Sequence, residues 1–396
     1  MKIAIIVRKL NIMGGTQREA LSFAHELKKQ GHEVTLYTFL YDKERCYPHL
    51  LNNFRVVSLN YYPPPSYFFL QWMQENRTSR ALALLIDDAT DVLNPHDQVS
   101  YRVAYYFKKK KNIPSVWMMN DMPTRYVSSF IIGRELDSNL SVSLMKQWCY
   151  RLIDAIEIRK FIRAQDTIVV LDSRDRDWVR EYYNKDAVII RNGLDVAQFS
   201  YVPRTPPGSK NVRLLCAGIF LPHRRFEDAI EAVGILHKKG YSVHLSVAGD
   251  YMSRPEYYKK IKRLVFELSL NSHVSFLGKI PENKWCDIFA KNDIFLFPNH
   301  MQSWGIVVFE AMASGVPVVV SKTAGASEVL TNGETGLLIN PKAPGEIADA
   351  VVRLVETSGL YERLSKNGRA LVENNISWQR YTKEMLDVIA SCRKRG

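Results

Sequence analysis

The chain has 396 residues, which is enough for two or three domains of ordinary size. Hydrophobic residues make up 46% and charged residues 24%, which excludes a disordered, collagen-like or small disulfide-stabilised chain. Lys and Arg number 54 against 41 Asp and Glu, and the resulting net charge of +13 favours anionic partners such as phosphates, nucleic acid or an acidic membrane surface.

The five cysteines are dispersed and have neither the spacing of a zinc site nor a Cys-x-x-Cys pair. This pattern indicates reduced core thiols and a cytoplasmic protein. The N-terminal apolar run, residues 3–7, is short and ends at Arg8 and Lys9, so it does not resemble a signal peptide. No stretch approaches the roughly 18 apolar residues of a membrane span. We expect any membrane contact to be peripheral.

Short apolar runs alternate with helical patterns in the first half of the chain. Residues 3–7 predict a buried strand, residues 16–30 a helix that Gly31 ends, and residues 34–38 the next strand. Further strands are predicted at residues 82–86, 91–93, 116–119, 167–171 and 188–190. This alternation predicts a parallel sheet that is covered on both faces.

A segment rich in proline, residues 201–209, interrupts the pattern and predicts a linker, because its prolines cannot join a helix or sheet interior. After it the alternation restarts. Strands are predicted at residues 213–218, 242–248, 274–277, 294–297 and 316–320, and helices at residues 226–239, 256–268, 284–291 and 305–314. Two βαβ domains that meet at a cleft are the simplest interpretation.

Gly14 and Gly15 separate the first predicted strand from the first helix. Glycine lets a ligand approach the backbone, and the N-terminus of a helix favours an anion. The pair is not the G-x-G-x-x-G motif of a dinucleotide site, and an ordinary strand-to-helix turn explains it equally well.

Glu310 falls on an otherwise apolar helix that begins near Gly305, after the strand at residues 294–297. The free N–H groups at the start of that helix suit a diphosphate. A carboxylate among apolar residues needs partners, and two ribose hydroxyls would suit its two oxygens. The alternative is a structural ion pair, for example with Arg224.

Arg224 and Arg225 follow the first strand of the second half. Paired arginines at a strand end suit phosphate oxygens. Because the first turn of a helix disfavours cations, this position favours a bound anion over two solvated side chains.

Together these motifs resemble glycosyltransferase family 4, the retaining, nucleotide-sugar-dependent enzymes with the GT-B fold. The resemblance spans nearly the whole chain and is carried by Gly14-Gly15, Gly31-His32-Glu33-Val34, residues 191–195 (RNGLD), residues 310–319 (EAMASGVPVV), Gly325, Glu328, Gly333 and residues 335–338 (TGLL). It implies an α/β fold of two Rossmann-like domains with a cleft between them. Residues 1–200 would bind the acceptor and residues 210–375 the nucleotide sugar, while a helix within 376–396 would return to the first domain.

The resemblance also implies roles for single residues in binding the donor. Glu310 would bind the ribose and Arg224 the diphosphate, with Arg225 as a competitor for that role. The remaining donor contacts would come from Gly14, Gly15, Trp304, Gly305 and Ile306, and from Lys279 and Ile280 beside the base.

Glu282, near the implied base pocket, would suit the N1–H and N2–H₂ groups of guanine and so favours a GDP sugar over a UDP sugar. An acid at the start of a helix, next to Pro281, explains Glu282 at least as well.

Three positions depart from the family pattern. Gln302 stands in place of a glutamate, Ile219 in place of an arginine, and Asn120 in place of a histidine. His96 lies at another predicted strand end, where the family often has histidine. We predict catalytic roles for His96, Asn120 and Gln302. The departures leave open an alternative, a catalytically weak nucleotide-sugar-binding subunit of a glycosylation complex.

Three other features have simpler explanations. Residues 175–177 (Asp-Arg-Asp) have the spacing of a metal-binding motif, but acids that open a helix explain them better, and we expect no metal or cofactor. The lysines at 108–111 are expected to end a helix, and no nucleic-acid-binding motif is present, so we expect no nucleic acid partner. The aromatic residues within 61–73 favour a membrane interface or lipid-linked acceptor about as strongly as local core packing.

We therefore predict a hexosyltransferase. It would move a hexose from a GDP- or UDP-linked sugar to a hydroxyl of a glycan or lipid-linked acceptor, in cell-surface polysaccharide or glycolipid synthesis, with retention of anomeric configuration. We expect it in the cytoplasm, with a peripheral contact at the anionic inner face of the membrane.

Overall fold

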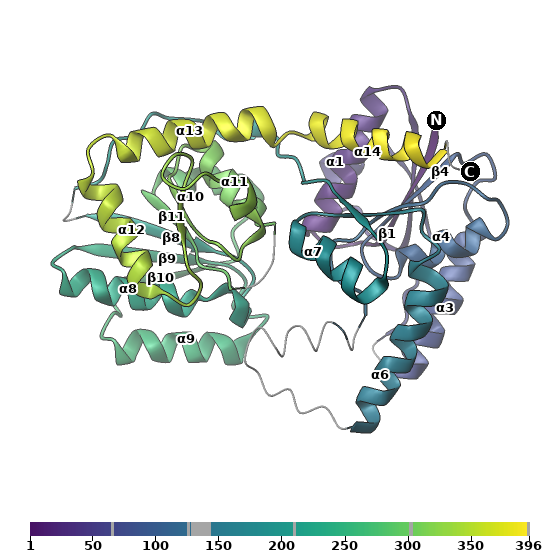
Figure 1. The fold of residues 1–396 in the computed structure, drawn as a ribbon, viewed down its shortest axis with the longest axis horizontal. Helices are drawn as coiled ribbons and strands as arrows, with labels where there is room; N and C mark the ends of the chain where they lie inside the picture. Colours follow the sequence, from purple (N-terminus) through teal and green to yellow (C-terminus); the bar gives the residue numbers. More distant parts are fainter. Residues whose placement is uncertain (65–66, 125–126, 128–143, 209–210, 301–303, 394–396) are drawn as a thin grey trace. The chain divides into compact units, whose positions relative to one another are not determined.

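A computed structural model describes residues 1–396 apart from 65–66, 125–126, 128–143, 209–210, 301–303 and 394–396. The chain divides into two compact units (Figure 1). The first unit comprises Met1–Gly193 and Trp378–Gly396, and the second comprises Leu194–Ser377.

The first unit is built on a seven-stranded parallel sheet with the order β3-β2-β1-β4-β5-β6-β7. Its strands are β1 (Lys2–Leu10), β2 (Glu33–Tyr41), β3 (Arg55–Ser58), β4 (Val92–His96), β5 (Val116–Met118), β6 (Thr167–Val170) and β7 (Ala187–Ile189). From β1 the chain first adds strands towards one edge and then returns to add β4 on the other side of β1. The strand order therefore reverses between β1 and β4, the position where open parallel sheets bind ligands, beyond the carboxyl ends of the strands.

Both faces of this sheet are buried. Ile3, Ile5 and Val7 of β1 face one hydrophobic core, and the alternate residues Ala4 and Ile6 face another. The helices and helical turns of the unit are α1 (Gly15–Lys29), α2 (Pro48–Leu51), α3 (Phe68–Ala83), α4 (Ser100–Lys108), α6 (Leu144–Ile156), η1 (Glu157–Ile162), α7 (Ser173–Trp178), η2 (Val179–Tyr183) and α14 (Trp378–Arg393).

The C-terminal helix α14 packs against α1, although more than 340 residues separate them in sequence. The ring of Phe23 on α1 meets the ring of Tyr381 edge to face, with centroids 5.4 Å apart. Tyr381, Met385 and Ile389 of α14 belong to the same hydrophobic core as α1 and β1. The last helix is therefore a structural part of the first unit (Figure 1).

The strand predicted at residues 82–86 is wrong, because these residues form the end of α3 and the turn that follows. Leu82 and Ile86 are buried, whereas Leu84 is 73% exposed, which is the spacing of a helix face. A short apolar run does not by itself distinguish a strand from the end of a buried helix.

The second unit contains a six-stranded parallel sheet with the order β10-β9-β8-β11-β12-β13. Its strands are β8 (Val212–Ala217), β9 (Val243–Ala248), β10 (Val274–Gly278), β11 (Ile294–Phe297), β12 (Val318–Ser321) and β13 (Leu337–Ile339). Its helices and helical turns are η3 (Val196–Gln198), η4 (Pro222–Arg224), α8 (Phe226–Lys238), α9 (Pro255–Glu267), η5 (Glu282–Lys284), α10 (Trp285–Ala290), α11 (Ile306–Ala313), η6 (Gly325–Val329), α12 (Pro344–Glu356) and α13 (Leu360–Asn375). Here the strand order reverses between β8 and β11.

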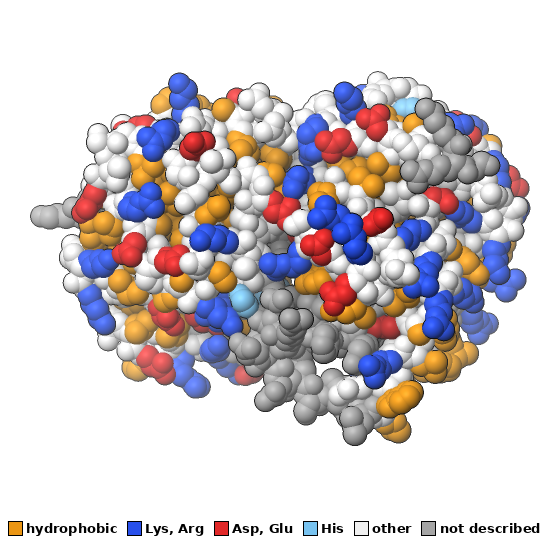
Figure 2. Space-filling model, in the orientation of Figure 1, with side chains coloured by type: hydrophobic (Ala, Val, Ile, Leu, Met, Phe, Trp, Pro, Cys, Tyr) orange, Lys and Arg blue, Asp and Glu red, His pale blue; other side chains and the backbone are white. Residues whose placement is uncertain are grey.

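The predicted α/β fold with two parallel sheets is confirmed. Residues 201–208 form neither helix nor strand, as their prolines predict. Within the described part of the chain, no helix has both the length and the apolarity needed to cross a membrane. Figure 2 shows Lys and Arg side chains dispersed among Asp and Glu over the face in view, so the surplus of positive charge forms no single patch on that face.

Candidate functional site

The candidate donor-binding residues of the second unit follow strands β8 and β11. These strands are parallel neighbours, so the loops at their carboxyl ends leave the same edge of the sheet. The backbone N–H of His300, after β11, donates to the carbonyl of His223, after β8, at 2.9 Å. The structure therefore brings the arginine loop and the loop that leads to Glu310 together at the point where the strand order reverses.

Arg224 and Arg225, which the sequence leaves as competitors, have different environments. Arg225 adopts a left-handed backbone conformation (φ 53°) before α8, and its guanidinium donates to both carboxylate oxygens of Asp228. Arg224 instead lies across Gly218, where an added Cβ would come within 3.3 Å of its Cδ. Its guanidinium carbon lies 5.9 Å from the centroid of the Phe297 ring, at the end of β11. Arg224 is therefore the better placed of the two to meet an anion near β11.

A glycine on the neighbouring strand fixes the backbone of the arginine loop. Gly249 follows β9 and has a φ of 152°, and a Cβ there would lie 2.0 Å from the carbonyl oxygen of Gly218. Only glycine permits this approach of two backbones. The loop that carries Arg224 thus depends on a residue that the sequence analysis did not single out.

Glu310 is the fifth of the eight residues of α11, a helix that begins after Gly305, which has a left-handed conformation (φ 72°). Glu310 is only 6% exposed, and its neighbours in sequence, Phe309 and Ala311, are also buried. Trp304 is also buried and stacks on Phe309, with ring centroids 4.7 Å apart. The entry to the helix is thus held by aromatic packing and by the N–H of Val308, which donates to the carbonyl of Gly305 at 2.9 Å. The N–H groups of Ile306 and Val307 come before the first hydrogen bonds of the helix.

Two polar residues beside these loops were not predicted from the sequence. Burial lowers the pKa of His223 to about 4, with a further contribution from Arg224, so the imidazole is neutral at pH 7. Asn299, which follows β11, is 1% exposed, and its Nδ2 has no hydrogen-bond partner among the described residues. Their positions in the loops that follow β8 and β11 could have identified them, but the sequence does not reveal their burial.

The residues assigned to a base pocket lie at the end of β10, two strands away from β8. Gly278 has a φ of 73°, and its carbonyl accepts from the N–H of Gly249 at 2.9 Å. Lys279 is exposed and Ile280 is half-buried. Glu282 is exposed and begins the helical turn η5 next to Pro281. This is the arrangement expected of an acid that opens a helix, the alternative given above for Glu282. Contact of these residues with a base stays a prediction.

In the first unit, Gly14 is the residue before α1, and Gly15 is the first residue of that helix. A Cβ on Gly14 would lie 2.6 Å from the side-chain oxygen of Gln17, whereas a Cβ on Gly15 would meet no atom within 4 Å. Space is therefore available at Gly15 at the N-terminus of a 15-residue helix, which suits an anion.

His96 and Asn120 meet a carboxyl group that the sequence analysis missed, Glu19 of α1. One oxygen of Glu19 accepts from Asn120, and from Nδ2 of Asn192 at 3.2 Å; the other accepts from the Tyr381 hydroxyl at 2.9 Å. Burial raises the pKa of Glu19 to about 7, against the opposing effect of these hydrogen bonds.

His96 itself has no exposed surface. One ring nitrogen contacts Oδ1 of Asn94 at 2.7 Å, and the other lies 3.7 Å from Glu19. Burial lowers the pKa of His96 to about 3, so this contact is not an ion pair at neutral pH. Buried in this way, His96 could influence a reaction only through its neighbours, and its catalytic role stays a prediction. Gln302, the third residue predicted to be catalytic, lies outside the described residues.

The motif at residues 175–177 opens a helix, as predicted. Asp172 caps α7, and its Oδ1 accepts from the N–H of Asp175 at 2.9 Å. In the described residues, no group of three or more His, Cys, Asp or Glu side chains could hold a metal ion. Lys108 is the last residue of α4 and pairs with Asp166, and the lysines at 109–111 follow the helix.

Comparisons with known proteins agree with this architecture over both units. The model of Glycosyltransferase Family 4 matches residues 13–198, and that of Glycosyl transferases group 1 matches residues 201–371. An uncharacterized glycosyltransferase from Methanocaldococcus jannaschii is 24% identical, with coverage of 98% of this chain and 97% of the relative. Phosphatidyl-myo-inositol mannosyltransferase from Mycobacterium leprae is 25% identical, covering 100% of this chain and 98% of the relative.

Solved structures share the fold. Sucrose-phosphate synthase from Thermosynechococcus elongatus has a TM-score of 0.77 at 19% identity, with full coverage of both chains. Anabaena HepE, solved in complex with UDP-glucose, has a TM-score of 0.72 at 16% identity, covering 98% of this chain and 99% of that one. The two family models together span residues 13–371 except for residues 199 and 200. The chain is therefore a glycosyltransferase of family 4 with the GT-B fold.

Proposed function

We propose that the chain transfers a hexose from a UDP- or GDP-linked sugar to a hydroxyl of a glycan or lipid-linked acceptor, with retention of anomeric configuration. The observation that carries the proposal is Glu310, a buried carboxylate just over one turn into α11, the helix that follows β11 at the ligand-binding edge of the second sheet. A carboxylate in this position suits two ribose hydroxyls, which can donate to its two oxygens.

The diphosphate of the donor would lie between Arg224 and the N-terminus of α11. Both favour negative charge, and both would stabilise the charge that develops on the leaving diphosphate. The tie between the backbones of His300 and His223 holds the two loops at this edge before any ligand arrives. Preorganised donors of this kind lower the barrier because they need little reorganisation during the reaction.

Retention would follow a front-side path, in which the leaving phosphate accepts the proton of the acceptor hydroxyl. This path needs no metal ion and no covalent nucleophile from the chain. Asn120 and Gln302 would then position sugar hydroxyls, while His96 would act through Glu19. Anabaena HepE, which shares the fold, binds UDP-glucose in its solved complex, and this supports a nucleotide sugar as the donor here.

A lipid-linked acceptor is supported by a relative and by a surface. The Mycobacterium leprae relative is a phosphatidyl-myo-inositol mannosyltransferase. At the start of α3, Tyr67 is 90% exposed, Phe69 is 60% exposed and Leu70 is also exposed. Aromatic residues in such a position suit the interface of a bilayer, and we propose a peripheral contact with the inner face of the membrane for cell-surface polysaccharide or glycolipid synthesis.

The test is incubation of the full chain with UDP- and GDP-linked hexoses, followed by measurement of released nucleotide. Glycosyltransferases of this kind are expected to hydrolyse their own donor slowly when water replaces the acceptor. Release of one nucleotide, lost in Glu310→Gln, supports the proposal. Tight nucleotide-sugar binding without release or transfer would instead indicate the catalytically silent subunit, and absence of binding would contradict both.

A further inference from the structure

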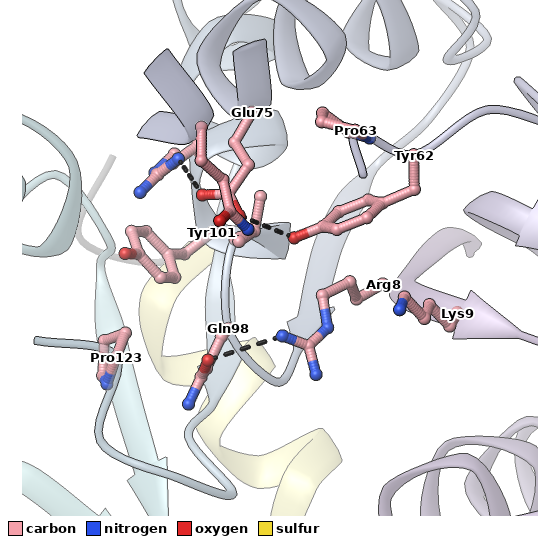
Figure 3. Close-up of a pocket in the computed structure, with 11 residues that line it drawn as sticks. Arg8, Lys9, Tyr62, Pro63, Glu75, Gln98, Tyr101 and Pro123 are labelled. Carbon is pink, nitrogen blue, oxygen red and sulfur yellow. Dashed lines mark hydrogen bonds and ion pairs between the residues drawn. The ribbon is translucent and has the colours of Figure 1, made fainter. Parts of the chain in front are cut away.

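A polar pocket of about 240 Å³ lies in the first unit, where the sheet order reverses (Figure 3). Arg8 and Lys9 contribute from the end of β1, and Gln98 and Val99 from the loop after β4. The donor site proposed above uses none of these residues. The position is nevertheless the one at which a parallel sheet is expected to bind a ligand.

The acidic groups of the pocket are already engaged by the protein. Glu75 accepts from the Tyr62 hydroxyl at 2.8 Å, from Gln71 at 3.1 Å and from Arg102 at 3.2 Å. Arg102 also pairs with the buried Glu157 at 2.7 Å. Arg102 is therefore neutralised between two acids, and the oxygens of Glu75 are directed at protein donors.

The basic groups are less completely engaged. Arg8 makes long contacts, 3.4 Å from its Nε to Asp97 and 3.4 Å from its Nη1 to Gln98. The ammonium of Lys9 lies 5.0 Å from the centroid of the Tyr62 ring, and no described residue accepts a hydrogen bond from it. Figure 3 shows the guanidinium of Arg8 directed towards Gln98, and the side chain of Lys9 beside that of Arg8. Burial lowers the pKa of Lys9, and the neighbouring Arg8 lowers it further, so the charge on Lys9 lacks sufficient compensation.

Three positive groups and three negative groups surround the pocket, so their formal charges cancel and the net charge does not decide what binds. The groups are Arg8, Lys9, Arg102, Glu75, Asp97 and Glu157. The orientation of the hydrogen-bonding groups decides which ligand binds. The acids accept hydrogen bonds from the protein, whereas Lys9 offers N–H groups that no described residue accepts. A carboxylate or phosphate accepts such hydrogen bonds about twice as strongly as a neutral hydroxyl.

The loop after β4 is held in an unfavourable backbone conformation beside these cations. Asp97 and Val99 have φ values of 68° and 70°, and positive φ is costly for a β-branched residue such as Val99. The indole of Trp117 donates to the carbonyl of Asp97 at 3.0 Å and helps to retain the loop. Strain of this kind concentrates at ligand sites, where the surrounding structure maintains it.

We propose that this pocket recognises an anionic group, a carboxylate or a phosphate, on the acceptor, with Lys9 and Arg8 as the residues that determine this specificity. The inference rests on the proposed function, because only a transferase takes an acceptor. The shared chemistry of the two anions is an oxygen pair that accepts hydrogen bonds from an ammonium and a guanidinium.

The test measures binding to the full chain by ligand-observed NMR titration with four probes. Methyl glucuronide differs from methyl glucoside only at C6, where it has a carboxylate in place of a hydroxymethyl group. Glucose 6-phosphate and inorganic phosphate test the other anion. We expect at least one anionic sugar to bind about tenfold more tightly than methyl glucoside, since a hydrogen bond to a charged group is worth more than a neutral one. Whether the carboxylate or the phosphate is preferred identifies the source of the charge.

Variants separate the pocket from general charge effects. Lys9→Gln should remove most of the preference, whereas Lys9→Arg should keep it. Gln98→Glu should also remove the preference for anionic sugars. The new carboxylate would pair with Arg8 and Lys9 in place of the ligand, while both cations remain in the chain. Lys43→Gln, which neutralises an exposed lysine of the same unit, should leave the preference unchanged.

Equal binding of charged and neutral sugars by the wild-type chain would overturn the inference, as would a preference that survives both Lys9→Gln and Gln98→Glu. Titration of UDP and GDP into the same wild-type sample distinguishes failure of the pocket inference from failure of the proposed function. If nucleotide binds and charge preference is absent, only the pocket inference fails. If neither nucleotide binds, the proposed function fails.

Discussion

Glu19 should make the stability of the first unit depend on pH, because its carboxyl group is almost completely buried. It is 1% exposed and joins α1 to α14 through the Tyr381 hydroxyl, and to the ends of β5 and β7 through Asn120 and Asn192. Burial penalises the charged form more than these hydrogen bonds favour it, and the pKa is raised to about 7.

The size and sign of the effect follow from linkage. Between the unfolded pKa of 4.5 and the folded pKa of about 7, the folded chain holds a proton on Glu19 that the unfolded chain has released. The protonated carboxyl therefore contributes stability that is fully present below pH 4.5 and is lost as the pH rises to 7. The difference between the two pKa values corresponds to about 3 kcal/mol of unfolding free energy.

Glu19→Gln removes this titration and keeps a side chain of the same shape. The amide oxygen can still accept from the asparagines, and the tyrosine hydroxyl can accept from the amide nitrogen. We expect the variant to become more stable relative to wild type by about 3 kcal/mol between pH 4.5 and 8. Burial lowers the pKa of His96, and burial is the same in both proteins, so we expect its titration to contribute similarly to each.

The assay is urea unfolding across this pH range, followed by hydrogen exchange of peptides from β1 and α1. A local readout is needed because a chain with two units need not unfold in a single step. Glu33→Gln, at an exposed carboxylate at the start of β2, serves as the matched control. If Glu19→Gln and wild type show parallel dependence on pH, the carboxyl is ionised in the folded chain and the reasoning is wrong.

Replacement of Arg102 by Met should destabilise the first unit by about 3–5 kcal/mol in urea unfolding, because two buried acids lose their shared cation; Arg180→Met, at an exposed ion pair, should cost less than about 1 kcal/mol. Gly249→Ala should weaken nucleotide binding at least tenfold in a calorimetric titration, because the added Cβ displaces the arginine loop. The added Cβ of Gly240→Ala meets open space at a φ of 86°, so this variant should cost only about 1 kcal/mol of stability and leave binding intact. Asp177→Asn and treatment with EDTA should both leave transfer activity unchanged, and a loss that added Mg²⁺ or Mn²⁺ restores would reject the metal-free reaction.

The parts of the fold that sequence reasoning predicts well are those with a strong local pattern. Residues 294–297 form a fully buried apolar run, and the structure has β11 at those residues. Residues 82–86 are equally apolar but end a helix, because their burial depends on packing against distant strands. β3 was missed because its four residues are only half-buried or exposed and lie at the edge of the sheet, where the apolar signal is weak.

The candidate site divides along the same line. Glu310 is detectable because a carboxylate among apolar helix residues is conspicuous in any sequence. Glu19 lies on a helix with ordinary amphipathic spacing. Its burial and its hydrogen bond to Tyr381, a residue 362 positions away, are visible only in the folded chain. Arg8 and Lys9 likewise appear in the sequence as the end of an apolar run, and the order of the strands places them in one pocket with Gln98.

Direct titration of UDP and GDP into the wild-type chain and Glu310→Gln tests the central claim, that the second unit holds a nucleotide diphosphate sugar through this carboxylate. We expect one nucleotide to bind, and the variant to bind it at least about tenfold more weakly, because the ribose hydroxyls lose a charged acceptor. Glu334→Gln, at an exposed carboxylate of the same unit, should match wild type. Equal affinity of wild type and Glu310→Gln would contradict the account.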